Sequence, residues 1–156
     1  MPEKIIIYID GAARGNPGPA GYGIYATDEN KEEIAEAWGY IGEQTNNFAE
    51  YVGLIAALEL ALENGWRKVH VRSDSQLLVR QLTGQYKVKN EVLANFYRRA
   101  QVLRSRFLKF TIEHVLRKFN KDADRLANKA IDTQSSEPKS INPVRVSTNE
   151  SDSSRR

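Results

Sequence analysis

The chain has 156 residues, no cysteine, and 23 basic against 20 acidic side chains, for a formal net charge of +3 at pH 7. Disulfide and thiol chemistry are therefore excluded, and no apolar run is long enough to cross a membrane. The first apolar run is also too short for a secretory signal, so we expect a cytoplasmic protein with one folded domain.

The first third of the chain predicts three strands. Residues 4–9, KIIIYI, form an apolar, β-branched run typical of a strand buried on both faces. This run ends on Asp10, and the glycine- and proline-rich segment 11–21 predicts a break or turn after it. Residues 22–27 and 33–41 favour the second and third strands. We therefore expect Asp10 to lie at the end of the first strand.

A long helix is predicted for residues 45–64. Polar residues at 45–47 can cap its start, and Gly65 follows its end. At about 100° per residue, Glu50 lies opposite the polar stripe of this helix and faces inward. An inward carboxylate is costly unless a cation, hydrogen-bond donors or a salt bridge compensates it.

The next strand predicts where a second acid lies. Residues 68–73 alternate like a strand, and Asp74 follows directly before a helix-like run over 75–82. Taken alone, Asp74 is most simply a helix cap. Strands joined through a helical crossover run parallel, however, so Asp74 and Asp10 are expected at the same edge of the sheet, where open α/β sheets place their sites.

The last elements are a helix from about residue 91 to 106, a strand over 109–115 and a helix opened by Asn120. Asp124 falls in the first turn of this final helix, where its simplest role is to interact favourably with the helix dipole.

Apolar periodicity stops after residue 133 and gives way to Ser, Asn, Pro and charged residues. We therefore predict one catalytic domain over residues 1–133 and a flexible tail over 134–156.

Five short motifs give the chain a family resemblance. Each is weak alone, but together they stand in one order that is highly specific. The chain resembles a ribonuclease H of type 1, in the compact branch that lacks a basic protrusion, because residues 84–90 pass directly to the next helix. The motifs are YIDG (8–11), GNPGPAG (15–21), TNNFAE (45–50), SDSQ (73–76) and NKDADRLA (120–127).

The resemblance implies an α/β fold, the ribonuclease H-like fold. Its five-stranded mixed sheet begins with an antiparallel meander of strands 1–3. Strands 4 and 5 are added parallel to strand 1, and helices cover both faces.

The resemblance also implies an endonuclease that hydrolyses the RNA strand of RNA/DNA hybrids, leaving 5′-phosphate and 3′-hydroxyl ends. Two Mg²⁺ ions bind with the substrate, and Mn²⁺ is expected to substitute. Asp10 would bridge both ions, Glu50 and Asp74 would complete one site, and Asp124 would hold the ion on the nucleophile side. We expect a monomer.

Substrate contacts implied by the resemblance divide between the two nucleic-acid strands. One group, together with backbone amides, would read the RNA 2′-hydroxyls, and a second would hold DNA phosphates. Simpler roles are capping and turn formation for the asparagines and a solvated basic surface for the lysines. Glu43 replaces an arginine of the DNA phosphate pocket in relatives, which predicts a weaker pocket. The RNA group is Gly11, Asn16, Asn46 and Gln76, and the DNA group is Thr45, Lys87, Lys89 and Asn90.

Two residues could assist the four acids. Many relatives carry a mobile histidine in a loop before the last acid, but His114 falls within the predicted fifth strand and is expected to be a packed or surface residue. Arg117 resembles the substitute found in compact members and is assigned the auxiliary role.

Two other functions remain open at the level of sequence. A DNA-cutting nuclease of the same fold is disfavoured, because DNA has no 2′-hydroxyl for the asparagines and Gln76 to read. A non-catalytic hybrid-binding module is disfavoured because all four acids are present. The sequence does not decide whether RNA duplexes are also cut.

Overall fold

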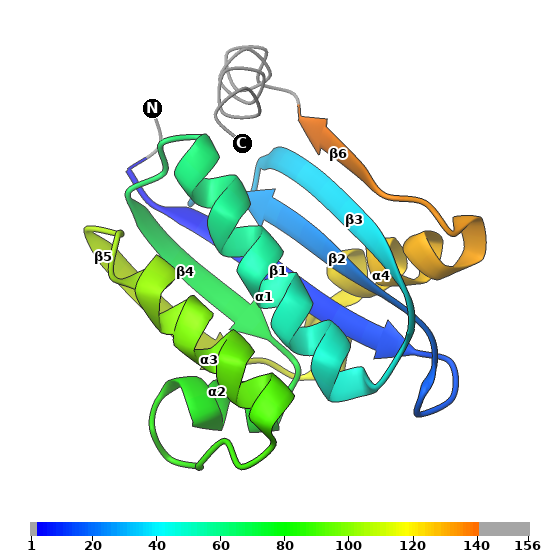
Figure 1. Ribbon diagram of the computed structural model, residues 1–156. Helices are drawn as coiled ribbons and strands as arrows, with labels where there is room; N and C mark the ends of the chain where they lie inside the picture. Colours follow the sequence, from blue (N-terminus) through cyan, green and yellow to red (C-terminus); the bar gives the residue numbers. More distant parts are fainter. Residues whose placement is uncertain (1–2, 141–156) are drawn as a thin grey trace.

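A six-stranded sheet forms the centre of the computed structural model, which describes residues 3–140 (Figure 1). Its strand order is β5-β4-β1-β2-β3-β6, in which β1 to β3 form an antiparallel meander and β4 and β5 run parallel to β1. The predicted five-stranded mixed sheet is confirmed, with one strand added. The strands are β1 (Ile5–Ala13), β2 (Gly18–Thr27), β3 (Glu33–Gln44), β4 (Lys68–Ser73), β5 (Lys109–His114) and β6 (Glu137–Ser140).

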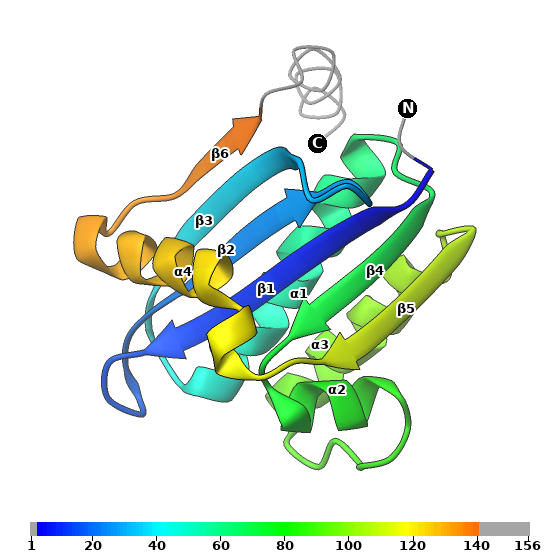
Figure 2. The same ribbon diagram turned by 180° about the vertical axis from the view of Figure 1, so that it is seen from behind.

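Helices cover the two faces unequally. Three helices lie on one face of the sheet, and α4 alone packs on the other, across β1 to β3 (Figures 1 and 2). Residues 83–90 join α2 directly to α3, which confirms the predicted absence of a protrusion. No helix in the described part of the chain is both long and apolar enough to span a bilayer. The helices are α1 (Asn46–Glu63), α2 (Gln76–Leu82), α3 (Glu91–Arg104), the 3₁₀ turn η1 (Arg117–Phe119) and α4 (Lys121–Thr133).

Strand β1 is longer than the sequence predicts. We expected the strand to end at Asp10, but β1 continues to Ala13 because its last residues still pair with β2. Its parallel pairing with β4 does end earlier, at Ile9 opposite Ser73. Asp10 therefore lies inside a strand, yet it is the first residue of β1 beyond the end of β4.

The boundary predicted for the flexible tail, at residue 134, lies too early in the chain. Instead of being unstructured from residue 134, the chain turns back at Gln134, which has a left-handed backbone, and forms β6 against β3. The amide of Tyr40 donates to the carbonyl oxygen of Ser135 at 3.1 Å, which brings the segment to the β3 edge. An edge strand offers unpaired backbone groups, and β6 satisfies part of them. Residues 141–156 lie outside the described residues.

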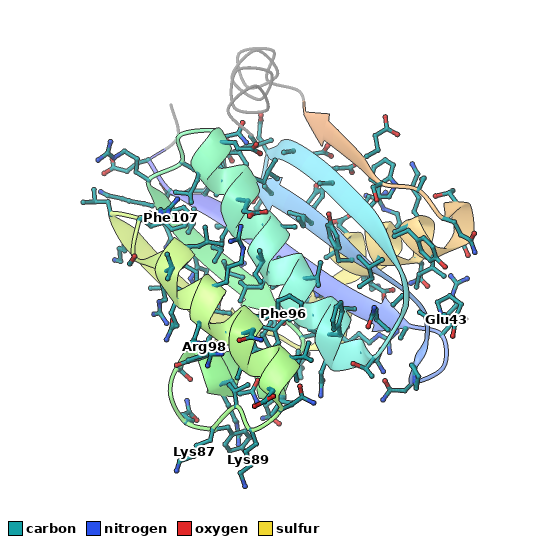
Figure 3. The ribbon with its side chains drawn as sticks, viewed as in Figure 1. Glu43, Lys87, Lys89, Phe96, Arg98 and Phe107 are labelled. Atoms are coloured by element: carbon teal, nitrogen blue, oxygen red, sulfur yellow. The ribbon has the colours of Figure 1, made fainter. Side chains whose placement is uncertain are left out.

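The main core fills the space between the sheet and α1. The β1 side chains of Ile5, Ile7 and Ile9 are buried there. Phe96 of α3 lies where this helix passes α1 (Figure 3) and meets Phe48 edge-to-face, with ring centroids 4.9 Å apart. Aromatic packing of this kind fixes α1, which carries Glu50, relative to α3.

On the other face, the backbone of α4 comes very close to the backbone of β2 at Gly23. A Cβ placed on Gly23 would lie 2.2 Å from the carbonyl oxygen of Ala123 and 2.6 Å from the amide nitrogen of Ala127. Only glycine fits at this distance. The position of α4, and of Asp124 on it, therefore depends on the absence of a side chain at Gly23.

We predict that Gly23→Ala lowers the free energy of unfolding by about 3 kcal/mol or more, because backbone atoms of α4 cannot move aside as a side chain can. The matched control is Gly42→Ala. Gly42 has φ of +75° but no atom of the described residues within 4 Å of its would-be Cβ, so the loss should be about 1–2 kcal/mol. Urea unfolding of both variants makes the comparison, and equal losses would contradict it.

Candidate active site

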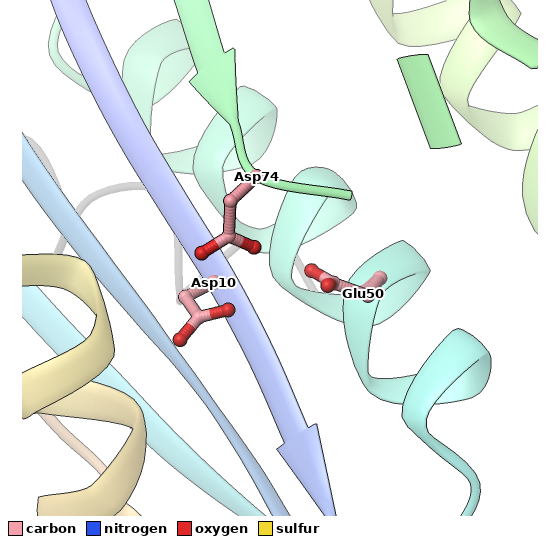
Figure 4. A group of neighbouring side chains, drawn as sticks. All are labelled: Asp10, Glu50 and Asp74. Atoms are coloured by element: carbon pink, nitrogen blue, oxygen red, sulfur yellow. The ribbon is translucent and has the colours of Figure 1, made fainter. Parts of the chain in front are cut away.

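Three carboxylates from separate elements converge beside the C-terminal end of β4. Asp10 comes from β1, Glu50 from the first half of α1, and Asp74 from the residue that follows β4 (Figure 4). One oxygen from each of the three lies within 4.8 Å of the others. Asp10 is buried, and the other two are partly exposed. The predicted meeting of Asp10, Glu50 and Asp74 is therefore confirmed as geometry.

Glu50 reaches the cluster because α1 touches β1 at Gly11. A Cβ on Gly11 would lie 2.4 Å from both the Ala49 carbonyl carbon and the Glu50 amide nitrogen. The Gly11 amide donates to Glu50 Oε1 at 2.9 Å. Gly11, which the resemblance assigns to RNA contact, thus also orients a member of the acidic cluster.

Asn120 holds the cluster from the α4 side, a role that sequence reasoning missed. We expected Asn120 to open the helix, but its side chain makes no capping hydrogen bond. Instead its Nδ2 donates to the Ile9 carbonyl oxygen at 2.9 Å and contacts Asp74 Oδ2 at 3.3 Å. The residue is 1% exposed, and its Oδ1 has no hydrogen-bond partner among the described residues. A buried amide so placed is a positioning group for Asp10 and Asp74.

The cluster is electrostatically unfavourable when no cation is bound. The pKa of Asp10 is raised to about 8, chiefly by burial and also by the charge of Asp74 and a hydrogen bond with Asp124. Burial also raises the pKa of Glu50 well above its usual value, with contributions from the charges of Asp10 and Asp74. The Gly11 hydrogen bond opposes this shift in the pKa of Glu50 but does not reverse it. The protein therefore concentrates negative charge here at a cost.

Asp124 lies beside this cluster and is not one of the three carboxylates that form it. It sits in the first turn of α4, as predicted, and its influence on the pKa of Asp10 shows that the two carboxyl groups are neighbours. Its Oδ1 is 3.6 Å from Nη2 of Arg117. Arg117 is 80% exposed, so this ion pair is weak by itself.

The predicted RNA-contacting asparagines join the β1–β2 turn to the start of α1. The amide of Asn46 donates to Asn16 Oδ1 at 3.0 Å, and the amide of Ala13 donates to Asn46 Oδ1 at 2.8 Å. Gln76 is exposed in the first turn of α2. The structure thus gives both asparagines the turn-forming role considered above, and their backbone and amide edges remain at the surface.

Two predicted phosphate contacts are helix caps. Thr45 accepts from the amide of Phe48 and caps α1, and Asn90 accepts from the amide of Leu93 and caps α3. Helix N-termini favour anions, so the caps leave the predicted role open. Glu43 is exposed near the end of β3.

A buried glutamine anchors the lysine-bearing loop 83–90 to the core. Gln81 accepts from the hydroxyl of Tyr51 at 2.6 Å and donates to the Lys87 carbonyl oxygen at 3.3 Å. Lys87 and Lys89 project from this loop at the lower edge of the molecule in Figure 3, away from Glu43 at the right edge.

His114 is the last residue of β5 and is exposed. The prediction that it lies within the fifth strand is therefore confirmed.

The clustered groups fit a hard divalent cation. All three are carboxylates, and Mg²⁺ prefers oxygen ligands. A protein-bound Mg²⁺ ion usually has one or two carboxylate ligands, and water or phosphate oxygens complete its coordination shell. A cation would also relieve the repulsion that raises the pKa of Asp10. Asp10, Glu50 and Asp74 are the residues that could hold it.

Known proteins resemble the chain across most of its length. The reverse transcriptase-like family matches residues 8–130. A bifunctional protein of Mycobacterium tuberculosis is 47% identical over 130 residues, which cover 83% of this chain and 36% of that protein. Ribonuclease HI of Halobacterium salinarum is 43% identical over 129 residues, covering 83% of this chain and 65% of that one. The chain thus spans about a third of the length of the bifunctional protein and about two thirds of the length of ribonuclease HI.

Solved structures give the same picture. The crystal structure of RNase H1 from Halobacterium salinarum has a TM-score of 0.81 at 43% identity, and the match covers 83% of this chain and 98% of that one. LC11-RNase H1, solved in complex with an RNA/DNA hybrid, has a TM-score of 0.79 at 45% identity with the same coverage.

We predict that stability without divalent cations falls as pH rises. Asp10 has a pKa of about 8 when folded against 3.8 for the ordinary side chain, so the folded state holds the extra proton between these values. The free energy of unfolding should drop by up to about 2 kcal/mol between pH 6 and pH 8. Melting curves in chelator measure this.

Asp10→Asn should flatten that dependence, and Mg²⁺ or Mn²⁺ should raise the melting temperature of the wild type more at pH 8 than at pH 6. Glu29→Gln, an exposed acid in the β2–β3 turn, is the control and should behave as wild type. A wild-type melting temperature insensitive to both cations would contradict the site.

Proposed function

Because the chain belongs to the type 1 ribonuclease H family, we propose that it is an endonuclease that hydrolyses the RNA strand of RNA/DNA hybrids. The observation that carries this proposal is the carboxylate cluster of Asp10, Glu50 and Asp74 at the end of the parallel strands. A relative 45% identical to this chain was crystallised with such a hybrid, which supports the choice of substrate.

The proposed chemistry is phosphodiester hydrolysis that leaves 5′-phosphate and 3′-hydroxyl ends. When bound, two Mg²⁺ ions, or Mn²⁺ in their place, would supply an activated water and charge stabilisation for the departing 3′ oxygen. The residues that would hold them are Asp10, Glu50, Asp74 and Asp124. Asn120 and the Gly11 amide hold these groups before substrate arrives, so little reorganisation is required.

We also propose how the two strands are told apart. The 2′-hydroxyls, the groups that DNA lacks, would be read by Asn16, Asn46, Gln76 and the backbone amides near Gly11. The hydrogen bond from the Asn46 amide to Asn16 and the one from the Ala13 amide to Asn46 hold the β1–β2 turn against the start of α1 before binding. Thr45 and Asn90 would hold a DNA phosphate at their helix N-termini.

Lys87 and Lys89 would follow the DNA backbone, since their loop is exposed and tied to the core through Gln81. The acidic Glu43, near the end of β3, would weaken the phosphate pocket relative to an arginine at that position.

The first test is cleavage of end-labelled RNA/DNA hybrid, RNA duplex and DNA duplex in Mg²⁺. We expect the RNA strand of the hybrid to be cut and the DNA duplex to stay intact. Asp10→Asn should lower kcat by about 10²–10³, the range for loss of one group that stabilises transition-state charge. Glu29→Gln serves as the matched control. RNA duplex cleavage would broaden the substrate range.

Two outcomes would replace the proposal. Cutting of duplex DNA would indicate a DNA nuclease of the same fold. Hybrid binding without cleavage by the wild type would indicate a binding module.

We predict that Arg117→Ala lowers kcat about ten-fold and leaves KM for the hybrid within two-fold, because Arg117 neighbours Asp124 and not the strand-reading surface. Pre-steady-state bursts separate chemistry from product release. Lys118→Ala, whose ammonium lies over the Phe119 ring, is the control. If Arg117→Ala changes neither turnover nor release, the auxiliary role is wrong.

A further inference from the structure

Asp124 is partly exposed, and a neighbour on α4 contacts its side chain. Its side chain is 31% exposed. Asn128, one helical turn further along α4, donates through Nδ2 to the Asp124 carbonyl oxygen at 3.0 Å. The same nitrogen is 3.4 Å from Asp124 Oδ1. A carboxylate with this exposure needs such contacts to keep one rotamer.

The orientation of the Asn128 amide is set by Arg14. Nη2 of Arg14 donates to Asn128 Oδ1 at 3.0 Å. A guanidinium carries only donors, so the oxygen of the amide must face Arg14. The Nδ2 group is thereby directed at Asp124. With Arg14 absent, the amide could turn over and present its oxygen to the carboxylate, which would repel it.

Arg14 itself is anchored at two further points. Its backbone amide donates to the Pro19 carbonyl oxygen at 2.9 Å, which closes the β1–β2 turn. Its Nη1 pairs with Asp132 at 2.6 Å, with both side chains about half exposed or more. A pair this exposed contributes little stability, so Asp132 can be removed with small effect.

The same turn also reaches α1, since Asn16 accepts from the Asn46 amide at 3.0 Å. One turn thus contacts both helices that carry acids, α1 with Glu50 and α4 with Asp124. From this arrangement we propose that Asn128 is a positioning residue for Asp124 and that Arg14 sets the Asn128 amide in the orientation that donates to it. This inference rests on the proposed function for its effect on turnover, but not for its effect on cation binding.

The experiment measures cation binding without nucleic acid and turnover with it. Melting temperatures across a Mn²⁺ titration give the half-saturating concentration, and steady-state cleavage of hybrid gives kcat and KM. The variants are Asn128→Leu, which keeps bulk but removes the amide, together with Arg14→Ala, Arg14→Lys and Asp124→Asn. Asp132→Ala is the matched control, since it breaks the surface pair of Arg14 but not its bond to Asn128.

We expect Asn128→Leu to raise the half-saturating Mn²⁺ concentration and to lower kcat, each about ten-fold, with KM for hybrid within two-fold. Arg14→Ala should change both quantities in the same direction. Arg14→Lys should recover part of the loss, because the lysine ammonium, like the guanidinium, can only donate hydrogen bonds. Asp132→Ala should match wild type. Adding Asn128→Leu to Asp124→Asn should cause no further loss, since the two act through one group.

Three results would overturn the inference. In the first, Asn128→Leu lowers the melting temperature in chelator but leaves the Mn²⁺ titration unchanged, as a purely structural residue would. In the second, Arg14→Ala raises KM while Asn128→Leu is normal, which means that Arg14 contacts nucleic acid directly. In the third, the two losses add in the double variant. If the wild type cleaves no hybrid, the proposed function fails, and the Mn²⁺ titration alone decides the role of Asn128.

Discussion

The acidic cluster depends on the contact between β1 and α1 at Gly11. A side chain there would strike the backbone of Ala49 and Glu50, so glycine alone lets the helix come close enough for Glu50 to accept from the strand amide. Neighbouring residues on a strand point to opposite faces of the sheet. Gly11 faces α1, so Asp10, the residue before it on β1, points toward α4 and Asp124. Gly23 then gives α4 its own close approach. Two positions without side chains thus bring α1 close to β1 and α4 close to the neighbouring strand β2.

This convergence opposes folding, because it places carboxylates where burial and mutual repulsion disfavour their charge. The raised pKa values of Asp10 and Glu50 express that cost. The core between the sheet and α1, and the fixed hydrogen bonds of Asn120, hold the groups together regardless. A bound cation would relieve the repulsion between the carboxylates, and the free energy released in this way would add to its affinity. The clustering of the carboxylates therefore both destabilises the fold and allows it to bind metal.

Much of the fold follows from local patterns. Strand runs that end in acids placed Asp10 and Asp74 at one edge of the sheet through the rule for parallel strands, and the helical period turned Glu50 to the inward face of its helix. The patterns failed where a tertiary contact decides. β1 extends past Asp10 because β2 pairs with residues that carry a turn-like composition, and β6 forms because the edge of β3 is open to it. Asn120 reads as a cap but bonds to Ile9 across the sheet, 111 residues away in sequence. No window of sequence contains such a contact.

The loop 83–90 shows how a compact chain can keep a nucleic-acid surface without an inserted protrusion. The buried hydroxyl of Tyr51 on α1 bonds to Gln81, which in turn bonds to the backbone of Lys87, and Arg80 contacts the ring and hydroxyl of Tyr86. The loop is therefore fixed to the helix that carries Glu50. Tyr51 is the neighbour of Glu50 on α1, so this chain of hydrogen bonds links the position of the lysine loop to the position of one of the acids.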